Sequence, residues 1–192
     1  MLKEPNNWSW LRKNVRPWIK KEGVLDVVVF GSAVRGKNTP HDLDICILLY
    51  DHQEKKSLDL IHSLSKIMDK PGRRVQINVL TGKMFIRGED SLAKTLLQEG
   101  LSLTTGKPLC ANYGLIPASL FLYSLVGFSA SQRVRFHYLL RGRKGQPGVL
   151  SPLGAELLSD GIISIPTRQE DRFAEILTSW NVKYQIQRIL RC

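Results

Sequence analysis

Two aspartates, Asp42 and Asp44, stand directly before an apolar run from Ile45 to Leu49. Residues i and i+2 of a strand share a face, so both carboxylates are predicted to point the same way, with Leu43 on the opposite side. Neighbouring carboxylates repel each other, and a divalent cation relieves that repulsion. Because oxygen ligands favour Mg²⁺ or Mn²⁺, the pair predicts a metal site with Asp42 and Asp44 as ligands and catalytic residues.

A second group of candidate residues lies just upstream, after the β-branched run Val27 to Phe30 that predicts a buried strand. Gly31 would let a ligand approach the backbone, and Ser32 can donate to a phosphate oxygen. Arg35 and Lys37, in the basic loop that follows, could neutralise phosphate charge. The predicted nucleotide-binding residues are therefore Gly31, Ser32, Arg35 and Lys37. The alternative, a tight turn followed by a solvated acidic turn, does not explain why both acids lead into a buried strand.

This stretch resembles the active-site signature of the DNA polymerase β-type nucleotidyltransferase superfamily, in particular the minimal nucleotidyltransferases with the pattern GSxxxGxxxxxSDxD. Gly31, Ser32, Gly36, Asp42 and Asp44 stand at the expected places, and His41 replaces the usual Ser. The resemblance covers about residues 23–112. It implies an α/β fold whose mixed, largely antiparallel sheet is backed by helices. It also implies transfer of a nucleoside monophosphate from an NTP, with ATP favoured, to an acceptor hydroxyl.

One position departs from the family pattern. The minimal enzymes carry a third carboxylate on the strand predicted here over residues 73–81, and alignment on Val79-Leu80-Thr81 places Asn78 there. An amide can ligate a metal or orient a hydroxyl, but it cannot accept a proton, and loss of a general base lowers a rate by ~10²–10⁴. The prediction leans towards an enzyme. The alternative is a catalytically weakened domain that binds nucleic acid or a partner protein. A third interpretation, the antitoxin-like half of a two-protein system, rests on the resemblance alone, and the long C-terminal extension fits it poorly.

Composition bounds the partners. The chain has 192 residues, a formal net charge of +11 and 43% hydrophobic residues, which is typical of a globular protein with a basic excess. Such an excess favours RNA or another polyanion, although solubility alone would also account for it. A protein or small-molecule acceptor stays open. The three cysteines form neither a zinc motif nor a disulfide framework. With no signal peptide and no apolar run long enough to span a membrane, we expect a cytoplasmic protein.

The other elements follow from hydrophobic periodicity. In residues 1–112, the predicted nucleotidyltransferase domain, we expect helices over residues 6–21, 51–69 and 85–99 and a closing strand and turn over residues 100–109. In residues 113–192 we expect a basic domain made of a helical hairpin and a β-α-β segment. The hairpin would pair a helix over residues 117–126 with one that begins at the capping box Ser129–Gln132. The β-α-β segment would comprise a strand over residues 161–166, a helix opened by a capping box at Thr167–Glu170, and a strand from Val182.

The densest basic segment lies in this second region. No acidic residue occurs from Arg133 to Lys144. A cationic, glycine-rich segment attracts a phosphate backbone, so the segment is a candidate nucleic-acid contact; a solvated charge run is the alternative. Its basic residues are Arg133, Arg135, Arg141, Arg143 and Lys144.

Overall fold

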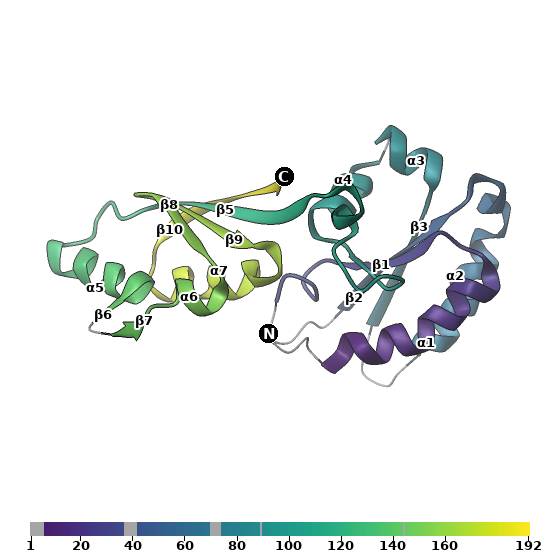
Figure 1. Ribbon diagram of the computed structural model, residues 1–192, viewed down its shortest axis with the longest axis horizontal. Helices are drawn as coiled ribbons and strands as arrows, with labels where there is room; N and C mark the ends of the chain where they lie inside the picture. Colours follow the sequence, from purple (N-terminus) through teal and green to yellow (C-terminus); the bar gives the residue numbers. More distant parts are fainter. Residues whose placement is uncertain (1–5, 37–41, 70–73, 89, 144) are drawn as a thin grey trace. The chain divides into compact units, whose positions relative to one another are not determined.

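The computed structural model describes residues 6–36, 42–69, 74–88, 90–143 and 145–192 (Figure 1). The chain divides between Leu115 and Ile116 into two compact units, called here the N-terminal unit and the C-terminal unit. Each unit has a sheet of its own and a hydrophobic core of its own. In the described part of the chain, no helix combines the length and the apolar character needed to cross a membrane.

The N-terminal unit is built on a four-stranded sheet with the order β3-β2-β1-β4. β2 and β3 run parallel, whereas β1 is antiparallel to both β2 and β4. This confirms the predicted mixed sheet. The closing turn also forms, because Ser102 donates its backbone N–H to the carbonyl of Lys107 (3.0 Å). The strands are β1 (Asp26–Phe30), β2 (Asp42–Leu49), β3 (Arg74–Thr81) and β4 (Leu101–Ser102).

Helices cover both faces of this sheet, and the alternation of side chains along β2 explains why. Leu43, Ile45 and Ile47 point into the core on the side of α1 and α2, while Cys46 and Leu48 pack on the side of α4. Asp44 therefore belongs to the face that α4 covers. The helices are α1 (Asn6–Glu22), η1 (Asp51–Lys56), α2 (Ser57–Met68), α3 (Gly82–Arg87), α4 (Ser91–Glu99) and η2 (Leu109–Tyr113).

The single helix predicted over residues 85–99 is wrong, because two short helices, α3 and α4, occupy this region. Gly88 ends α3 with φ of +62°, a conformation that glycine adopts without steric cost. Asp90 begins α4 by accepting the backbone N–H of Leu92 through Oδ1 (2.8 Å). The helix predicted over residues 51–69 likewise begins as the 3₁₀ segment η1 and becomes α-helical only at Ser57.

The C-terminal unit contains a second four-stranded sheet, with the order β10-β5-β9-β8 and every pair antiparallel. Its three α-helices pack on one face, where they share a core with Phe121, Ile163 and Ile165 of the central strands. The strands of this sheet are β5 (Ile116–Ser124), β8 (Glu156–Ser159), β9 (Ile162–Pro166) and β10 (Lys183–Arg191), and β6 (Gly142–Arg143) pairs with β7 (Gln146–Pro147) as a separate two-stranded sheet. The helices of the unit are α5 (Ala130–Arg141), α6 (Leu150–Leu153), η3 (Thr167–Gln169) and α7 (Glu170–Ser179).

The predicted helical hairpin is wrong, because residues 117–126 belong mostly to β5 rather than to a helix. β5 carries apolar side chains on both faces, with Phe121 buried in the core and Leu122 exposed on the opposite face, so its sequence reads as one largely apolar run. Such a run does not distinguish a central strand from a buried helix. The second predicted helix is confirmed as α5, with a capping box between Ser129 and Gln132.

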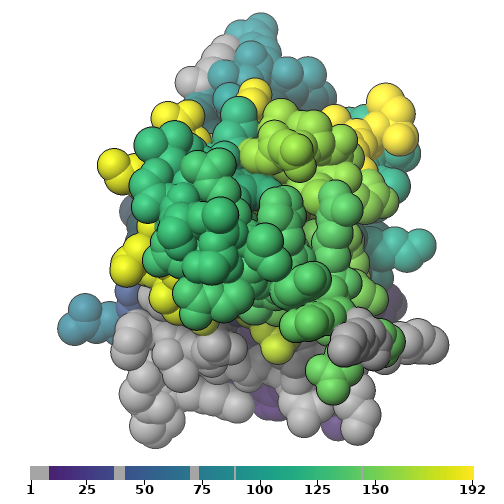
Figure 2. Space-filling model, turned by 90° about the vertical axis from the view of Figure 1, so that its left-hand side faces the viewer, coloured from purple at the N-terminus to yellow at the C-terminus, as the bar shows by residue number. Residues whose placement is uncertain are grey.

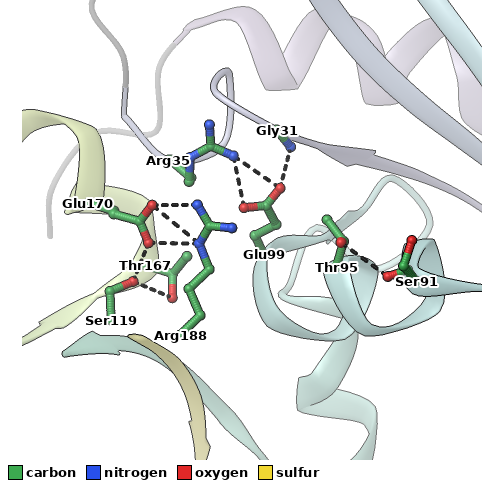
Figure 3. Close-up of polar contacts among 9 residues, drawn as sticks. All are labelled: Gly31, Arg35, Ser91, Thr95, Glu99, Ser119, Thr167, Glu170 and Arg188. Atoms are coloured by element: carbon green, nitrogen blue, oxygen red, sulfur yellow. Dashed lines mark hydrogen bonds and ion pairs between the residues drawn. The ribbon is translucent and has the colours of Figure 1, made fainter. Parts of the chain in front are cut away.

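A buried ion pair stands where the second capping box was predicted. Thr167 lies in η3, and α7 begins only at Glu170, so Thr167 does not cap this helix. Glu170 instead accepts hydrogen bonds from the Ser119 hydroxyl (2.6 Å) and from Nη2 of Arg188 (2.6 Å) (Figure 3). The carboxylate thus ties α7 to the central strand β5 and to the edge strand β10.

Candidate active site

The strands place Asp42 and Asp44 on one face, as their spacing predicts. Asp42 is the first residue of β2 and is exposed, Asp44 is half-buried, and Leu43 between them is buried on the other face. The pairing of β1 with β2 sets Phe30 opposite Asp44. The turn that follows Phe30 therefore begins beside this carboxylate.

The backbone of Gly31 lies close to the carboxylate of Asp44. Its φ is +78°, and a Cβ built on it would overlap Oδ2 of Asp44, so no other residue fits here without moving the carboxylate. The chain then turns sharply, since the carbonyl of Gly31 accepts the backbone N–H of Val34 (3.0 Å) and that of Arg35 (3.3 Å). Ser32 lies in this turn and is half-buried.

Glu99, the last residue of α4, holds the turn in place, and the sequence alone did not reveal this role. Its side chain is only 2% exposed. Oε1 accepts the backbone N–H of Gly31 (3.0 Å), and the carboxylate accepts two hydrogen bonds from Nη1 of Arg35 (3.1 and 2.9 Å) (Figure 3). Arg35, predicted to meet phosphate, is thus engaged by Glu99. A buried acid between a predicted helix and a glycine is the one sequence signal that could have pointed to this contact.

The environment of Asp44 disfavours the ionised form of its carboxyl group. Burial raises the pKa of Asp44 above its usual value, the charge of Asp42 raises it further, and Arg35 lowers it. Glu99 adds a smaller contribution that also raises this pKa. Bound positive charge near Asp42 and Asp44 would relieve this strain.

On β3, the residue nearest Asp44 in register is Gln76 rather than Asn78. The parallel pairing of β2 with β3 sets Asp44 opposite Gln76 and Cys46 opposite Asn78. Gln76 is exposed and lines, with Asp42, Arg74 and Val75, an open depression of about 540 Å³. Asn78 is half-buried, one step further along the same face. Sequence alignment missed Gln76 because the register of two strands is not written in either strand alone.

The remaining predicted site residues fall elsewhere. Lys37 and His41 lie outside the described residues, as does Lys144. Arg133, Arg135, Arg141 and Arg143 belong to the C-terminal unit.

The donors near β2 suit a hard divalent cation. No group of three or more His, Cys, Asp or Glu side chains within the described residues could hold a metal ion. The oxygen donors at this end of β2 are the two carboxylates, Asp42 and Asp44, with the amide of Gln76 in the register position opposite Asp44. Mg²⁺ is commonly held by one or two carboxylates together with substrate phosphates, so this set fits an ion that arrives with a nucleotide.

This fold and site define a class. A Gly-Ser turn that ends one strand, next to an Asp-x-Asp pair that opens the neighbouring strand of a mixed sheet, is the arrangement expected of a nucleotidyl-transferring domain. The family model named "Nucleotidyltransferase domain" matches residues 11–101, and this match is consistent with a nucleotidyltransferase domain of the DNA polymerase β type. No curated protein and no solved structure matches the chain in the corresponding searches.

The match to this family model has general consequences for the function of residues 11–101. It supports nucleotidyl transfer as the function of this domain and implies an NTP substrate; domains of this family generally use divalent metals. The match ends at residue 101, before the C-terminal unit begins.

Proposed function

We propose that the protein is a metal-dependent nucleotidyltransferase that moves a nucleoside monophosphate from an NTP, with ATP as the first candidate, to an acceptor hydroxyl. The observation that carries this proposal is the contact between Gly31 and Asp44, which leaves no room for a Cβ. This close packing places the predicted phosphate-binding turn beside a predicted metal ligand. A nucleotide site requires that proximity, because the phosphates and the metal must meet there.

Asp42 and Asp44 would hold Mg²⁺ or Mn²⁺, with the Gln76 amide as an orienting neighbour. When bound, the ion supplies charge neutralisation for the triphosphate and for the acceptor oxygen. Gly31 and Ser32 would bind the phosphates through backbone and hydroxyl donors. Glu99 and Arg35 keep that turn in shape through the contacts described above. Lys37 remains a proposed phosphate contact outside the described residues.

The acceptor oxygen forms a bond to the α-phosphorus, the bond between that phosphorus and the oxygen bridging to the β-phosphate breaks, and pyrophosphate leaves. The proton of the acceptor hydroxyl passes to solvent, because neither amide on β3, Gln76 or Asn78, can accept it. We therefore expect a slow enzyme, since the general-base contribution of ~10²–10⁴ is missing.

The test supplies α-³²P-labelled ATP, and then each other NTP, with Mg²⁺ or Mn²⁺, bulk cellular RNA, protein extract and a small-molecule fraction. The active-site variant is Asp42→Asn/Asp44→Asn. The matched control, Asp59→Asn/Asp69→Asn, removes two exposed carboxylates near α2 instead. Label that passes to one fraction with the wild type and the control, but not with the active-site variant, supports the proposal and names the acceptor class. Equal labelling by all three proteins would overturn it.

A second candidate function is binding without efficient catalysis, to nucleic acid or a partner protein. The observation in its favour is the pair of amides on β3 where the family carries a carboxylate. Gln76→Glu separates the two functions, because it places a carboxylate opposite Asp44 with almost no change of shape. A weakened enzyme gains label transfer from this substitution, and Asn78→Asp serves as the comparison. A protein that only binds transfers no label in either form.

A further inference from the structure

Helix α5 presents two contrasting faces. Phe136 and Leu140 are fully buried in the core of the C-terminal unit. Arg135, Tyr138 and Arg141 are exposed, and their spacing of three residues places them as neighbours along one side of the helix. The helix lies at the surface on the face shown in Figure 2, coloured teal-green. The outward side of α5 is therefore cationic and contains an aromatic ring.

The paired strands β6 and β7, which follow α5, add a third arginine to this side. The guanidinium carbon of Arg143, in β6, lies 4.9 Å from the centroid of the Tyr138 ring, within the range of a cation–π contact. Tyr138 remains 42% exposed in spite of this contact. Tyr138 thus contacts Arg143 and lies between Arg135 and Arg141 in the helical spacing, and we call these four residues the arginine face.

Arg133 is not part of the arginine face, because its side chain bonds to the backbone. Its Nε donates to the carbonyl of Phe128 (3.2 Å), at the start of the helix. It therefore fixes the entry of the chain into α5, although it remains exposed.

Close backbone packing fixes the start and the end of the β6–β7 pair, and this holds Arg143 in place. A Cβ on Gly142 would overlap the carbonyl oxygen of Gln146, and one on Gly148 would overlap that of Leu140. The backbone of Val149 then donates to the carbonyl of Leu139 (2.9 Å). Close backbone packing at both ends makes the arginine face pre-organised, which lowers the entropy that binding would otherwise consume.

The charge on the arginine face is not neutralised locally. Among the described residues, no carboxylate forms an ion pair with Arg135, Arg141 or Arg143. Burial is the largest cause of the raised pKa of Tyr123; the charge of Asp160 raises this pKa further, whereas the charge of Arg141 lowers it. The arginines are thus available to an anionic partner.

We propose that the arginine face binds the phosphodiester backbone of an RNA strand and thereby presents RNA as the acceptor. The choice of RNA as acceptor rests on the proposed transferase function. Arginine forks match phosphate oxygens in pairs, and Arg143 on the Tyr138 ring resembles the arginine–aromatic surfaces that support nucleic-acid strands. RNA supplies both the polyanion that this face requires and the hydroxyl that the transfer requires. An apolar protein partner fits poorly, since Val134 is the one large aliphatic side chain of α5 that is strongly exposed.

The test measures binding without NTP, so that its outcome does not depend on catalysis. Fluorescence anisotropy of a labelled RNA strand of mixed sequence is recorded against full-length protein at several KCl concentrations. The variant is Arg135→Gln/Arg141→Gln/Arg143→Gln. The matched control is Lys13→Gln/Arg16→Gln/Lys20→Gln, which removes three exposed charges from α1, the other basic helix. Circular dichroism checks that each variant is folded.

We expect the variant to bind RNA at least ~30-fold more weakly and to lower the slope of log K against log [KCl] by about 2, while the control changes affinity less than about threefold. Equal losses in variant and control, or undiminished binding by the variant, would overturn the proposal. Tighter binding of a DNA strand of the same sequence would overturn the choice of RNA. If the triple variant does not fold, Arg141→Glu replaces it, with an expected loss of about tenfold.

This design separates the two proposals. If the protein does not bind RNA but still transfers label, the proposal for the arginine face is overturned and the transferase proposal stands. If the protein binds RNA but transfers no label, the RNA-binding role of the arginine face stands and RNA is excluded as the acceptor.

Discussion

The two units each bury one glutamate against an arginine, and the two clusters differ in what they hold. Glu99 and Glu170 have side chains that are each 2% exposed. Glu99 accepts from Arg35 and from the backbone N–H of Gly31, whereas Glu170 accepts from Arg188 and from the Ser119 hydroxyl (Figure 3).

The partners decide what each glutamate does. Gly31 and Arg35, which donate to Glu99, belong to one short turn beside Asp44, so this carboxylate shapes a site. Ser119 and Arg188, which donate to Glu170, lie on two strands, β5 and β10, so that carboxylate joins packed elements. The same chemistry therefore serves position in one unit and cohesion in the other. Three substitutions test this difference.

The largest effect is expected from Glu170→Ala. The substitution removes the carboxylate that accepts hydrogen bonds from Arg188 and Ser119. Removing one partner of a buried ion pair lowers the free energy of unfolding by about 3 kcal/mol. Urea unfolding, followed by NMR signals of residues 116–192, measures this loss. Label transfer by the folded fraction should stay within about twofold. A large loss of transfer with unchanged stability would contradict the assignment of Glu170 to cohesion.

A smaller effect, of a different kind, is expected from Glu99→Gln. The amide fills the same space but carries no negative charge, and its NH2 group cannot accept from Arg35 as a carboxylate oxygen does. A hydrogen bond to a charged group contributes about 1.5–3 kcal/mol. We expect kcat/KM for transfer to fall about 10–100-fold, mostly through a higher KM for the NTP, because the turn would hold the phosphates less well. Steady-state kinetics with the NTP varied measures the split between kcat and KM. A loss of stability with unchanged KM would show that Glu99 merely packs.

The smallest effect concerns Asp44, the carboxylate that neither glutamate cluster neutralises. Its raised pKa means that the folded state keeps a proton that the unfolded state releases, so wild-type stability falls as pH rises from the usual aspartate range through the raised pKa. Asp44→Asn removes this loss. We expect the variant to gain stability over wild type at about pH 7 and little at about pH 3.5. Urea midpoints at both pH values measure this difference, and an equal gain at both would contradict it.

Much of the N-terminal unit is predictable from the sequence, because its signals are local. The strand before Gly31, the shared face of Asp42 and Asp44, and the strand that carries Asn78 all follow from alternation and turn chemistry. The residues that the sequence missed depend on contacts between distant segments. Glu99 meets Gly31 across 68 positions of the chain, and Gln76 meets Asp44 only through the register of a parallel pair.

The C-terminal unit was harder to predict for a related reason. Both faces of β5 carry apolar side chains, Phe121 on the buried face and Leu122 on the exposed one, so the alternation that marks a half-buried strand disappears. The capping box at Ser129–Gln132 was recognisable because a cap is a contact within four residues. The same pattern at Thr167–Glu170 failed because Glu170 turns inward to Arg188, a tertiary contact that overrides the local one.

The pairing of β5 with β10 has a consequence for the modular character of the chain. Arg191 is the register partner of Ile116, so the C-terminal unit begins and ends at adjacent points of one sheet. A segment whose ends meet can be grafted into a surface loop of an unrelated host, because the host needs to spread its loop by only one strand spacing. We therefore expect residues 116–191 to tolerate such a transplant, which would carry the arginine face together with its own sheet into another protein.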